Sequence, residues 1–205
     1  MGLSAAAIKA SLDALAKNDE LLAGEIARIG YPEPRLRDRG YKTLLRTIVG
    51  QQVSVAAASS MWNKLEVELG EDFKPTCILE RDFDTLRACG LSRQKQGYAR
   101  SLCELVSAGE IDFEDLPADD EEAITELTRI KGIGRWSAEI YLLFAEGRGD
   151  MWPAGDLAVQ EGVKRLLEME ERPGEKELRE IGERWRPHRG AMAIWVWHFY
   201  ANPAL

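Results

Sequence analysis

Apolar residues recur along the chain at intervals of three and four positions, which is the spacing of one face of an α-helix. The sequence contains neither a convincing alternating strand pattern nor a strand–helix–strand rhythm. The pattern therefore predicts an all-α fold. The expected helices cover Ser4–Lys17, Asp19–Ile29, Tyr41–Val49, Ser54–Leu69, Asp82–Ala88, Arg93–Ser107, Asp120–Arg129, Arg135–Glu146, Leu157–Glu168, Glu175–Arg184 and His188–Tyr200.

Prolines and glycines interrupt this helical pattern at Tyr31–Pro34, Leu116–Pro117 and Arg172–Gly174. The first break separates an N-terminal helix pair from the rest of the chain. At 205 residues the chain can bury a substantial core, either as one compact domain or as two small lobes.

The formal net charge of −8 argues against simple binding to nucleic acid, which depends on Lys and Arg displacing counterions. The stretch from Glu110 to Glu126, with nine acidic residues and no basic one, accounts for this deficit. If the basic clusters elsewhere share a face, an acidic protein still presents a basic groove. These clusters are Arg93, Lys95 and Arg100; Arg129, Lys131 and Arg135; and Arg184, Arg186 and Arg189.

The composition offers little material for a metal or disulfide centre. The cysteines Cys77, Cys89 and Cys103 are too widely spaced for a disulfide framework or a metal cluster, so we expect buried thiols. An apolar stretch separates the two histidines, His188 and His198. We therefore expect metal-free chemistry. No apolar run reaches the roughly 20 residues that span a bilayer, so the default expectation is a cytoplasmic location.

The most informative segment is the turn Lys131-Gly132-Ile133-Gly134, where one amphipathic helix stops and a second begins. Glycine accepts positive φ and places no side chain between the backbone and a ligand. The start of the second helix offers outward-pointing amides and a partial positive dipole, which suit a phosphate. We expect Ser137 to add a hydroxyl group, and Lys131 and Arg135 to add charge.

Other interpretations of this turn fit less well. A dinucleotide-binding fingerprint needs a preceding strand and a third glycine, whereas here a helix precedes and Ser137 stands at the third position. A P-loop needs Gly-Lys-Ser/Thr, which is absent. A tight corner between two helices, with Ile130 and Ile133 in the core and no ligand, remains an alternative.

Three separated blocks of sequence carry a resemblance: Ile48–Ala57, then Lys131–Ala138 leading to Trp152–Leu157, and finally Trp185–Ala191. In order and spacing they resemble the helix-hairpin-helix glycosylases with a Gly-Pro-Asp region, specifically the 3-methyladenine DNA glycosylase II branch. The resemblance runs from about Tyr41 to Tyr200. It implies a two-lobed helical fold with the active-site cleft between the lobes. We expect a single unit over 1–205, with lobe A at about 35–115 plus the hairpin at 120–146, and lobe B from 1–30 and 157–205.

In the family that this chain resembles, the aspartate after the hairpin is catalytic, and the matching residue is Asp156. Breaking an N-glycosidic bond builds oxocarbenium character on the sugar, which a nearby carboxylate stabilises and whose capture by water it can assist. Asp156 would also be a favourable N-cap for the helix from Leu157. A cap and a catalyst are compatible roles.

Alkylated purines are electron-poor or cationic, and stack on aromatic rings with about 0.5–2 kcal/mol per cation–π contact. Trp136 and Trp197 match positions that line the family's pocket, and Tyr141, Trp152 and Trp195 are weaker candidates. Plain core packing is the alternative for each of these rings.

Bifunctional relatives use a lysine just after the hairpin glycines to form a Schiff base and nick the backbone. Trp136 matches that position and cannot do so. The resemblance thus implies that water releases the base and leaves an abasic site without strand cleavage. It implies no cofactor, although a monovalent cation bound by the hairpin stays open. The implied partner is double-stranded DNA with alkylated bases, which a monomer can bind, and 3-methyladenine, 7-methylguanine, 1-methyladenine and ethenoadenine all remain candidate substrates.

Base excision requires the nucleotide to flip out of the stack, at a cost of a few kcal/mol. Gln51 and Gln52 follow an apolar run, and their amides need partners, either buried backbone or a ligand. The family places a wedge residue in the matching turn, and by alignment Gln52 is the expected wedge. Some relatives have an apolar residue there, and the alternative is that both glutamines cap neighbouring helices. Arg189, in the third block, is expected to contact DNA.

Two other function classes remain as alternatives. A non-catalytic helix-hairpin-helix DNA-binding module would keep the hairpin without needing Asp156 beside aromatic residues. A helical scaffold for a protein partner would use the acidic stretch from Glu110 to Glu126 and would have no use for the hairpin.

Overall fold

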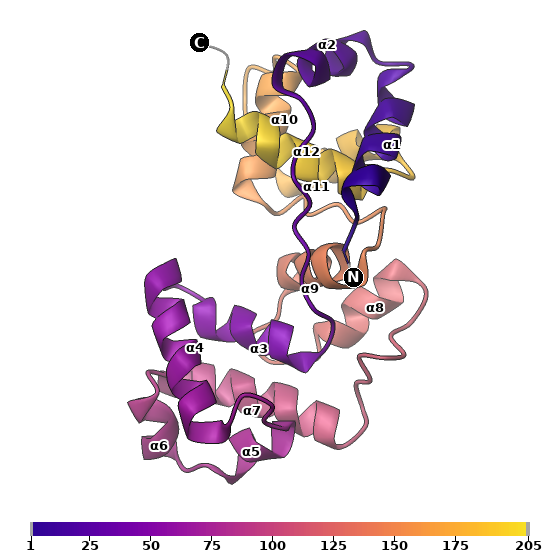
Figure 1. The fold of residues 1–205 in the computed structure, drawn as a ribbon. Coiled ribbons are helices and arrows are strands. Elements are labelled where there is room, and N and C mark those ends of the chain that lie inside the picture. The colour runs from indigo at the N-terminus through magenta and orange to yellow at the C-terminus, as the bar shows by residue number, and fades with distance from the viewer. Residues whose placement is uncertain (1, 204–205) are drawn as a thin grey trace. The chain divides into compact units, whose positions relative to one another are not determined.

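The computed structural model describes residues 2–203, and every regular element in that range is a helix (Figure 1). The expected all-α fold is confirmed. The chain divides into two compact units: unit 1 contains the described residues up to Arg37 and from Glu139 onward, and unit 2 contains Asp38 to Ala138. Across residues 2–203, no helix combines the length and apolar character that a membrane crossing requires.

Unit 2 is organised around α7, which packs against α3 and α5. The helical spacing of its apolar residues places them on inward faces, and Leu44, Leu65 and Leu102 are fully buried. Its helices are α3 (Tyr41–Gly50), α4 (Val55–Leu69), α5 (Pro75–Glu80), α6 (Phe83–Ala88), α7 (Arg93–Ser107), α8 (Asp120–Leu127) and the first part of α9 (Arg135–Tyr141).

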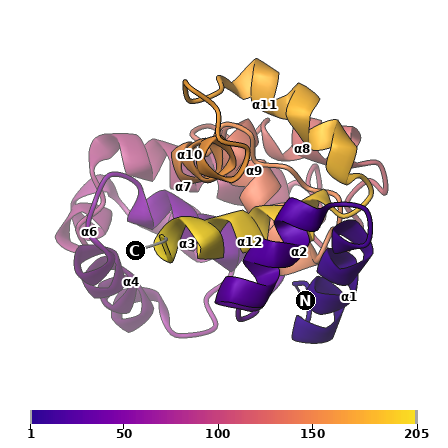
Figure 2. The same cartoon turned by 90° about the horizontal axis from the view of Figure 1, so that it is seen from above.

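Unit 1 brings N-terminal and C-terminal helices together. The apolar helix α12 contacts both α10 and α1 (Figure 2), and all its residues from Gly190 to Val196 are buried. Gly162 of α10 permits close approach, because a Cβ there would lie 2.5 Å from Cγ1 of Val196. The unit contains α1 (Ala5–Ala16), α2 (Glu20–Ile29), α10 (Leu157–Leu166), α11 (Glu175–Gly182), the 3₁₀ turn η2 (Glu183–Trp185) and α12 (Arg189–Ala201).

Five helices begin one residue later than the sequence predicts, because the first expected residue is the N-cap, and in four of them the side chain of that residue makes the capping bond. The side chains of Ser4, Asp19, Ser54 and Asp82 each accept a hydrogen bond from the backbone N–H three residues on. Such a residue lies outside the helix while it satisfies one of its amides. Helix α5 was missed because no capping side chain marks its start at Lys74, whereas α6, of the same length, begins after the Asp82 cap.

The helix expected over Arg135–Glu146 consists of two segments, since α9 continues as one wider π-helical turn, η1 (Leu142–Glu146). Unit 2 ends inside α9, whereas the expected lobe A extended to residue 146. The later residues group with unit 1 because they pack on α12. The rings of Phe144 and Trp197 lie 5.7 Å apart, and a Cβ on Gly190 would lie 2.9 Å from Cδ1 of Leu143.

Candidate functional site

The two glycines of the hairpin have different roles. Gly132 has a φ of 83°, a left-handed conformation that suits glycine, and a Cβ there would lie 2.2 Å from the Tyr98 ring. A Cβ at Gly134 would meet no atom within 4 Å. Ile130 and Ile133 are buried, as the helix-corner interpretation expects. The fold therefore requires Gly132, whereas Gly134 keeps the surface at the start of α9 clear of side chain.

The hairpin turn is fastened to two other parts of unit 2. The backbone N–H of Lys131 donates to Oγ of Ser101 over 3.1 Å. The carbonyl of Gly132 accepts from Nε2 of Gln51 over 2.8 Å. Tyr98 and Ser101, both on α7, were missed by the sequence reasoning, because no local pattern marks a contact across 30 residues. These contacts give the turn a defined position within unit 2.

The remaining hairpin residues differ in exposure. Trp136 is 44% exposed and Lys131 is exposed, as a ligand-facing role requires. Ser137 was expected to offer a hydroxyl group to a phosphate, but it is only 8% exposed. A buried hydroxyl group is not presented to a ligand, so this expectation is corrected.

Basic residues near the hairpin are paired with the acidic stretch. The Arg135 guanidinium donates to both carboxylate oxygens of Glu121, over 2.5 and 2.8 Å. Arg129 lies 2.5 Å from a carboxylate oxygen of Glu110. Both pairs are largely exposed, and such pairs exchange readily with other ions. The acidic residues therefore do more than lower the net charge, because they compete for the cations of the hairpin.

Other members of the expected basic clusters serve the fold. Lys95 is buried, and its Nζ donates to the carbonyl of Val49 over 2.7 Å. Burial lowers the pKa of Lys95. The Arg100 guanidinium donates to the carbonyls of Leu79, over 3.0 Å, and Arg81. The side chains of Lys95 and Arg100 therefore bind backbone carbonyls at helix ends within unit 2.

Arg189 was expected to contact DNA, and the structure corrects this. Its guanidinium donates to both carboxylate oxygens of Asp150, over 2.8 and 2.9 Å, and pairs with Glu183 over 3.0 Å. Its side chain is only 13% exposed. A guanidinium that is engaged on two sides and largely buried is a structural ion pair, and it holds the start of α12 to the loop at Asp150.

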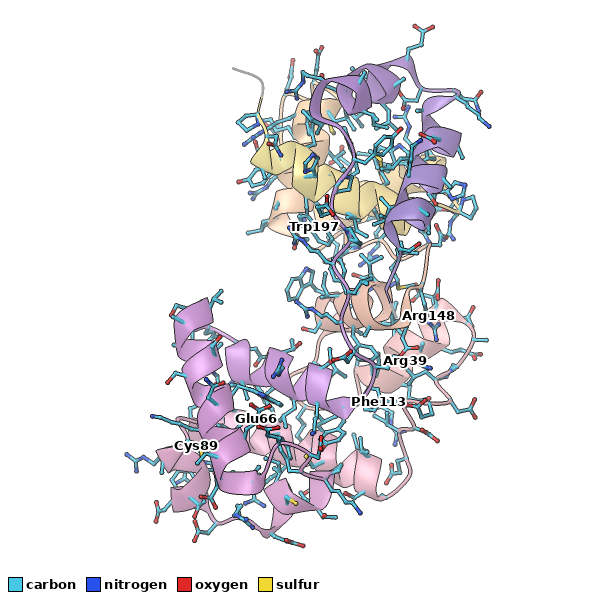
Figure 3. All side chains as sticks on the ribbon, in the orientation of Figure 1. Arg39, Glu66, Cys89, Phe113, Arg148 and Trp197 are labelled. Atoms are coloured by element: carbon cyan, nitrogen blue, oxygen red, sulfur yellow. The ribbon has the colours of Figure 1, made fainter. Side chains whose placement is uncertain are left out.

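Asp156 is the N-cap of α10 and is half-buried. Its Oδ1 accepts hydrogen bonds from the backbone N–H groups of Ala158, over 2.9 Å, and Val159, over 3.0 Å. The indole Nε1 of Trp197 donates to the same oxygen over 3.0 Å. Figure 3 labels Trp197 on α12. The expected cap is confirmed, and a side chain that belongs to the expected aromatic pocket holds the carboxylate.

The loop that delivers Asp156 is anchored by residues that the sequence reasoning missed. Gln160, one helical turn after Asp156, is buried, and its Nε2 donates to the carbonyl of Ala154 over 2.9 Å. Arg179 on α11 pairs with the buried Glu139 over 3.0 Å and donates to the carbonyl of Trp152 over 3.4 Å. Only the one-turn spacing of Gln160 could have signalled this role. The anchors restrict the backbone on both sides of the cap.

Two of the expected pocket residues belong to the core instead. Trp152 is 3% exposed, its Nε1 donates to the carbonyl of Leu178 over 2.9 Å, and its ring lies 5.1 Å from that of Trp185. Tyr141 is 2% exposed, and its hydroxyl group donates to Glu146 over 3.0 Å. Trp195, the third of the weaker candidates, is also fully buried. Rings enclosed in this way offer no face for stacking, so of the expected pocket residues only Trp136, in unit 2, and Trp197, in unit 1, keep a ring that is exposed or half-buried.

The two glutamines between α3 and α4 have separate environments. Gln51 is half-buried and donates to the hairpin, as described above. Gln52 is exposed and has a φ of 56°, which is unusual for a residue with a side chain. Ser54, and not a glutamine, supplies the side-chain cap of α4. Gln51 occupies the C-cap position of α3, where its backbone N–H donates to the carbonyl of Ile48, so the interpretation of both glutamines as helix caps holds for Gln51 and is wrong for Gln52.

The cysteines lie apart from these residues. Cys89 and Cys103 are buried, Cys77 is half-buried, and burial raises the pKa of the Cys103 thiol to about 12. An open groove of about 770 Å³ lies over Cys89 between α4 and α6, and none of the expected site residues lines it. Across residues 2–203 no three His, Cys, Asp or Glu side chains are grouped so that they could hold a metal ion.

A Gly-x-Gly hairpin between α8 and α9, followed by an aspartate N-cap held by a tryptophan, defines this chain as a helix-hairpin-helix protein. The chain belongs to the HhH-GPD superfamily of base excision DNA repair proteins, since residues 45–187 match that family. It is 33% identical to DNA-3-methyladenine glycosylase 1 of Schizosaccharomyces pombe, over 77% of this chain and 71% of the relative.

Solved structures agree with this assignment. The fold is similar to that of a DNA-3-methyladenine glycosidase from Bacillus halodurans, with a TM-score of 0.86, 31% identity, and coverage of 94% of this chain and 89% of that one. It is also similar to the Schizosaccharomyces pombe 3-methyladenine DNA glycosylase in complex with abasic DNA, with a TM-score of 0.78, 31% identity, and coverage of 91% and 94%. The family expected from the three sequence blocks is confirmed.

Proposed function

We propose that this chain is a monofunctional DNA-base glycosylase, which excises alkylated purines of the 3-methyladenine and 7-methylguanine type by hydrolysis of the N-glycosidic bond. The observation that carries the proposal is the carboxylate of Asp156, fixed by the Trp197 indole and by the first amides of α10. The glycosylase names of the relatives support an enzyme over a DNA-binding module without catalysis.

Asp156 acts on the sugar as the base leaves. Positive charge develops at the anomeric carbon, and a preorganised carboxylate stabilises it. The same carboxylate accepts a proton from the water that attacks the sugar. Three donors to Oδ1 prevent the side chain from rotating, so little reorganisation is needed in the transition state.

Trp197, which holds the Asp156 carboxylate, supplies an aromatic surface for the flipped base, and Trp136 offers an exposed indole of its own. An alkylated purine that carries positive charge is attracted to an indole face by about 0.5–2 kcal/mol, whereas a neutral purine gains less. Trp197 thus touches both the carboxylate and the base, which places the bond to be broken beside Asp156.

The product is an abasic site in an intact strand. Trp136 stands where a lyase of the family has its lysine, and an indole cannot form a Schiff base. Water is therefore the nucleophile that captures the sugar. No cofactor is needed for this chemistry, and a monovalent cation at the hairpin would act only on DNA binding.

The hairpin grips the DNA backbone. Gly134 leaves the start of α9 open, so that a phosphate can approach the backbone without meeting a side chain. Lys131 adds an exposed positive charge, and Arg135 adds a second when it exchanges Glu121 for a phosphate. Gln52, exposed in its turn, fills the gap left by the flipped base.

The chain acts as a monomer on double-stranded DNA in the cytoplasm, at the nucleoid if the cell is bacterial.

The test is base release from duplex DNA that has been treated with a methylating agent. Purified protein is expected to release free methylated purines and to leave alkali-labile abasic sites, with no borohydride-trapped covalent adduct. If base release stays at background level across several alkylated and deaminated lesions while DNA binding is intact, the enzyme proposal fails. The non-catalytic DNA-binding module then remains as the interpretation. A trapped adduct would overturn the monofunctional assignment.

A further inference from the structure

The turn between α3 and α4, residues 50–54, carries the exposed Gln52 and is held at its α3 end by two contacts from distant residues. This insertion turn leaves α3 at Gly50 and enters α4 at the Ser54 cap. Gln52 keeps a φ of 56°, which a residue with a side chain adopts only when its surroundings enforce it. The contacts that enforce it come from distant parts of unit 2.

Gln51 provides the first of these contacts. Its Nε2 donates to the carbonyl of Gly132, 81 residues away and inside the hairpin. That carbonyl cannot shift freely, because the Tyr98 ring packs directly on the Gly132 α-carbon. One side-chain hydrogen bond therefore joins the turn that carries Gln52 to the turn that grips the DNA backbone.

Lys95 provides the second contact. Its Nζ donates to the carbonyl of Val49, the residue before the turn, and the side chain is buried. Lys95, Tyr98 and Ser101 follow one another at intervals of three on α7, and thus share a face of that helix. This face holds the end of α3 through Lys95 and the hairpin through Tyr98 and Ser101.

We propose that Gln51 is a positioning residue, which keeps the insertion turn in register with the hairpin. The inference rests on the proposed function. Once the hairpin has bound the DNA backbone, the Gln51 bond fixes where Gln52 meets the base stack. A flipped nucleotide costs a few kcal/mol to hold out of the stack. If the insertion turn shifts, Gln52 leaves the gap and the base returns to the stack before it is excised.

The test replaces Gln51 by methionine, which keeps the length of the side chain and loses the donor. The bond is at the surface, so water can satisfy the Gly132 carbonyl and the variant is expected to fold with an unchanged thermal midpoint. Affinity for undamaged duplex should stay within about twofold, since the hairpin contacts to phosphate remain. Single-turnover excision of a paired lesion should fall about tenfold, because flipping is no longer held.

A lesion placed opposite an abasic position separates positioning from catalysis. Such a lesion has no pairing partner, so flipping costs less, and Gln51→Met should recover to within about twofold of the wild type. Wild-type excision of the paired lesion by Gln51→Met would overturn the inference. An equal loss on paired and unpaired lesions would overturn it as well, since that result reports a damaged catalytic site.

Two further measurements keep the inference testable. Lys95→Met removes the second contact, and should give the same selective loss on paired lesions if its thermal midpoint shows that it folds. If the wild type releases no base, the proposed function fails, but 2-aminopurine beside the lesion still reports distortion of the stack. Its fluorescence should then rise with wild-type protein and not with Gln51→Met, and equal rises would overturn the inference.

Discussion

The start of α9 in unit 2 and the start of α10 in unit 1 differ in what covers their first turns. At α10 the protein supplies its own anion, since Asp156 accepts from two backbone amides there. At α9 the preceding residue is Gly134, whose α-carbon faces open space. A helix start that already holds a carboxylate has little affinity for an external anion, whereas an open one attracts it.

The two helix starts therefore have different tasks in the proposed reaction. The open start of α9 suits a phosphate of the DNA backbone, which carries no information about the base. The closed start of α10 fixes a carboxylate that is then available to the sugar. The two starts can therefore be disabled separately, one by adding a side chain and the other by removing a charge.

The largest effect is expected for Asp156→Asn. Asparagine is a good N-cap, so α10 and its hydrogen bond pattern should persist. The negative charge that stabilises the oxocarbenium-like transition state is lost, and the single-turnover rate of base release should fall about 100- to 1,000-fold. Thermal unfolding and DNA affinity serve as controls and should match the wild type. Wild-type turnover by this variant would remove Asp156 from the chemistry.

The sequence anticipated this contrast, because glycine and aspartate have strong local preferences. Gly132 is in the expected left-handed conformation, and Asp156 is the expected cap. The backbone conformation at such positions depends on the few residues around them, so local sequence rules predict it. They also placed most of the helices, and missed only α5, a helix of six residues.

The burial and the pairing of the large side chains could not be predicted from local sequence. Trp152 and Trp197 have the same chemistry, yet Trp152 is closed in by α11, which lies well beyond it in the sequence. Arg189 is paired because Asp150 and Glu183 converge on it, although the sequence separates them by 39 and 6 residues. Burial of this kind depends on packing between distant segments, which periodicity does not encode.

The open start of α9 is tested by Gly134→Val. A Cβ at this position meets no atom within 4 Å, so we expect the variant to fold normally. It lies between the backbone and a phosphate, and the loss of a hydrogen bond to a charged group predicts DNA binding about tenfold or more weaker, for damaged and undamaged sequences alike. Gly132→Ala is the contrasting variant, because its Cβ would collide with Tyr98 and lower the thermal midpoint. Unchanged affinity in Gly134→Val would favour the helix corner without a ligand.

A smaller effect is expected where the two functions of Trp197 are separated. Trp197→Phe keeps an aromatic face and removes the indole N–H that holds Asp156. Loss of one hydrogen bond to a charged group should slow base release about five- to tenfold, with affinity for lesion-containing DNA nearly unchanged. Trp152→Phe is the matched control, because it removes an indole N–H that serves only the core. It should lower the thermal midpoint and leave the excision rate of the folded enzyme unaltered; an equal loss of rate in both variants would contradict a specific role for Trp197.

The smallest effect concerns the competition between the acidic stretch and DNA. Glu121→Gln removes the carboxylate that pairs with Arg135, while Asp119 still caps α8. Exposed pairs are worth about 0.2–1 kcal/mol, so DNA affinity should rise about two- to fivefold at low salt. Arg135 then adds up to one phosphate contact, and the slope of log affinity against log salt should steepen by about 0.9. Glu122→Gln makes the same change of charge in the same turn, and its carboxylate is not the partner of Arg135. Equal gains in affinity in the two variants would mean that only the net charge of the protein matters. A gain confined to Glu121→Gln would mean that DNA has to displace the Glu121 carboxylate before it binds the hairpin.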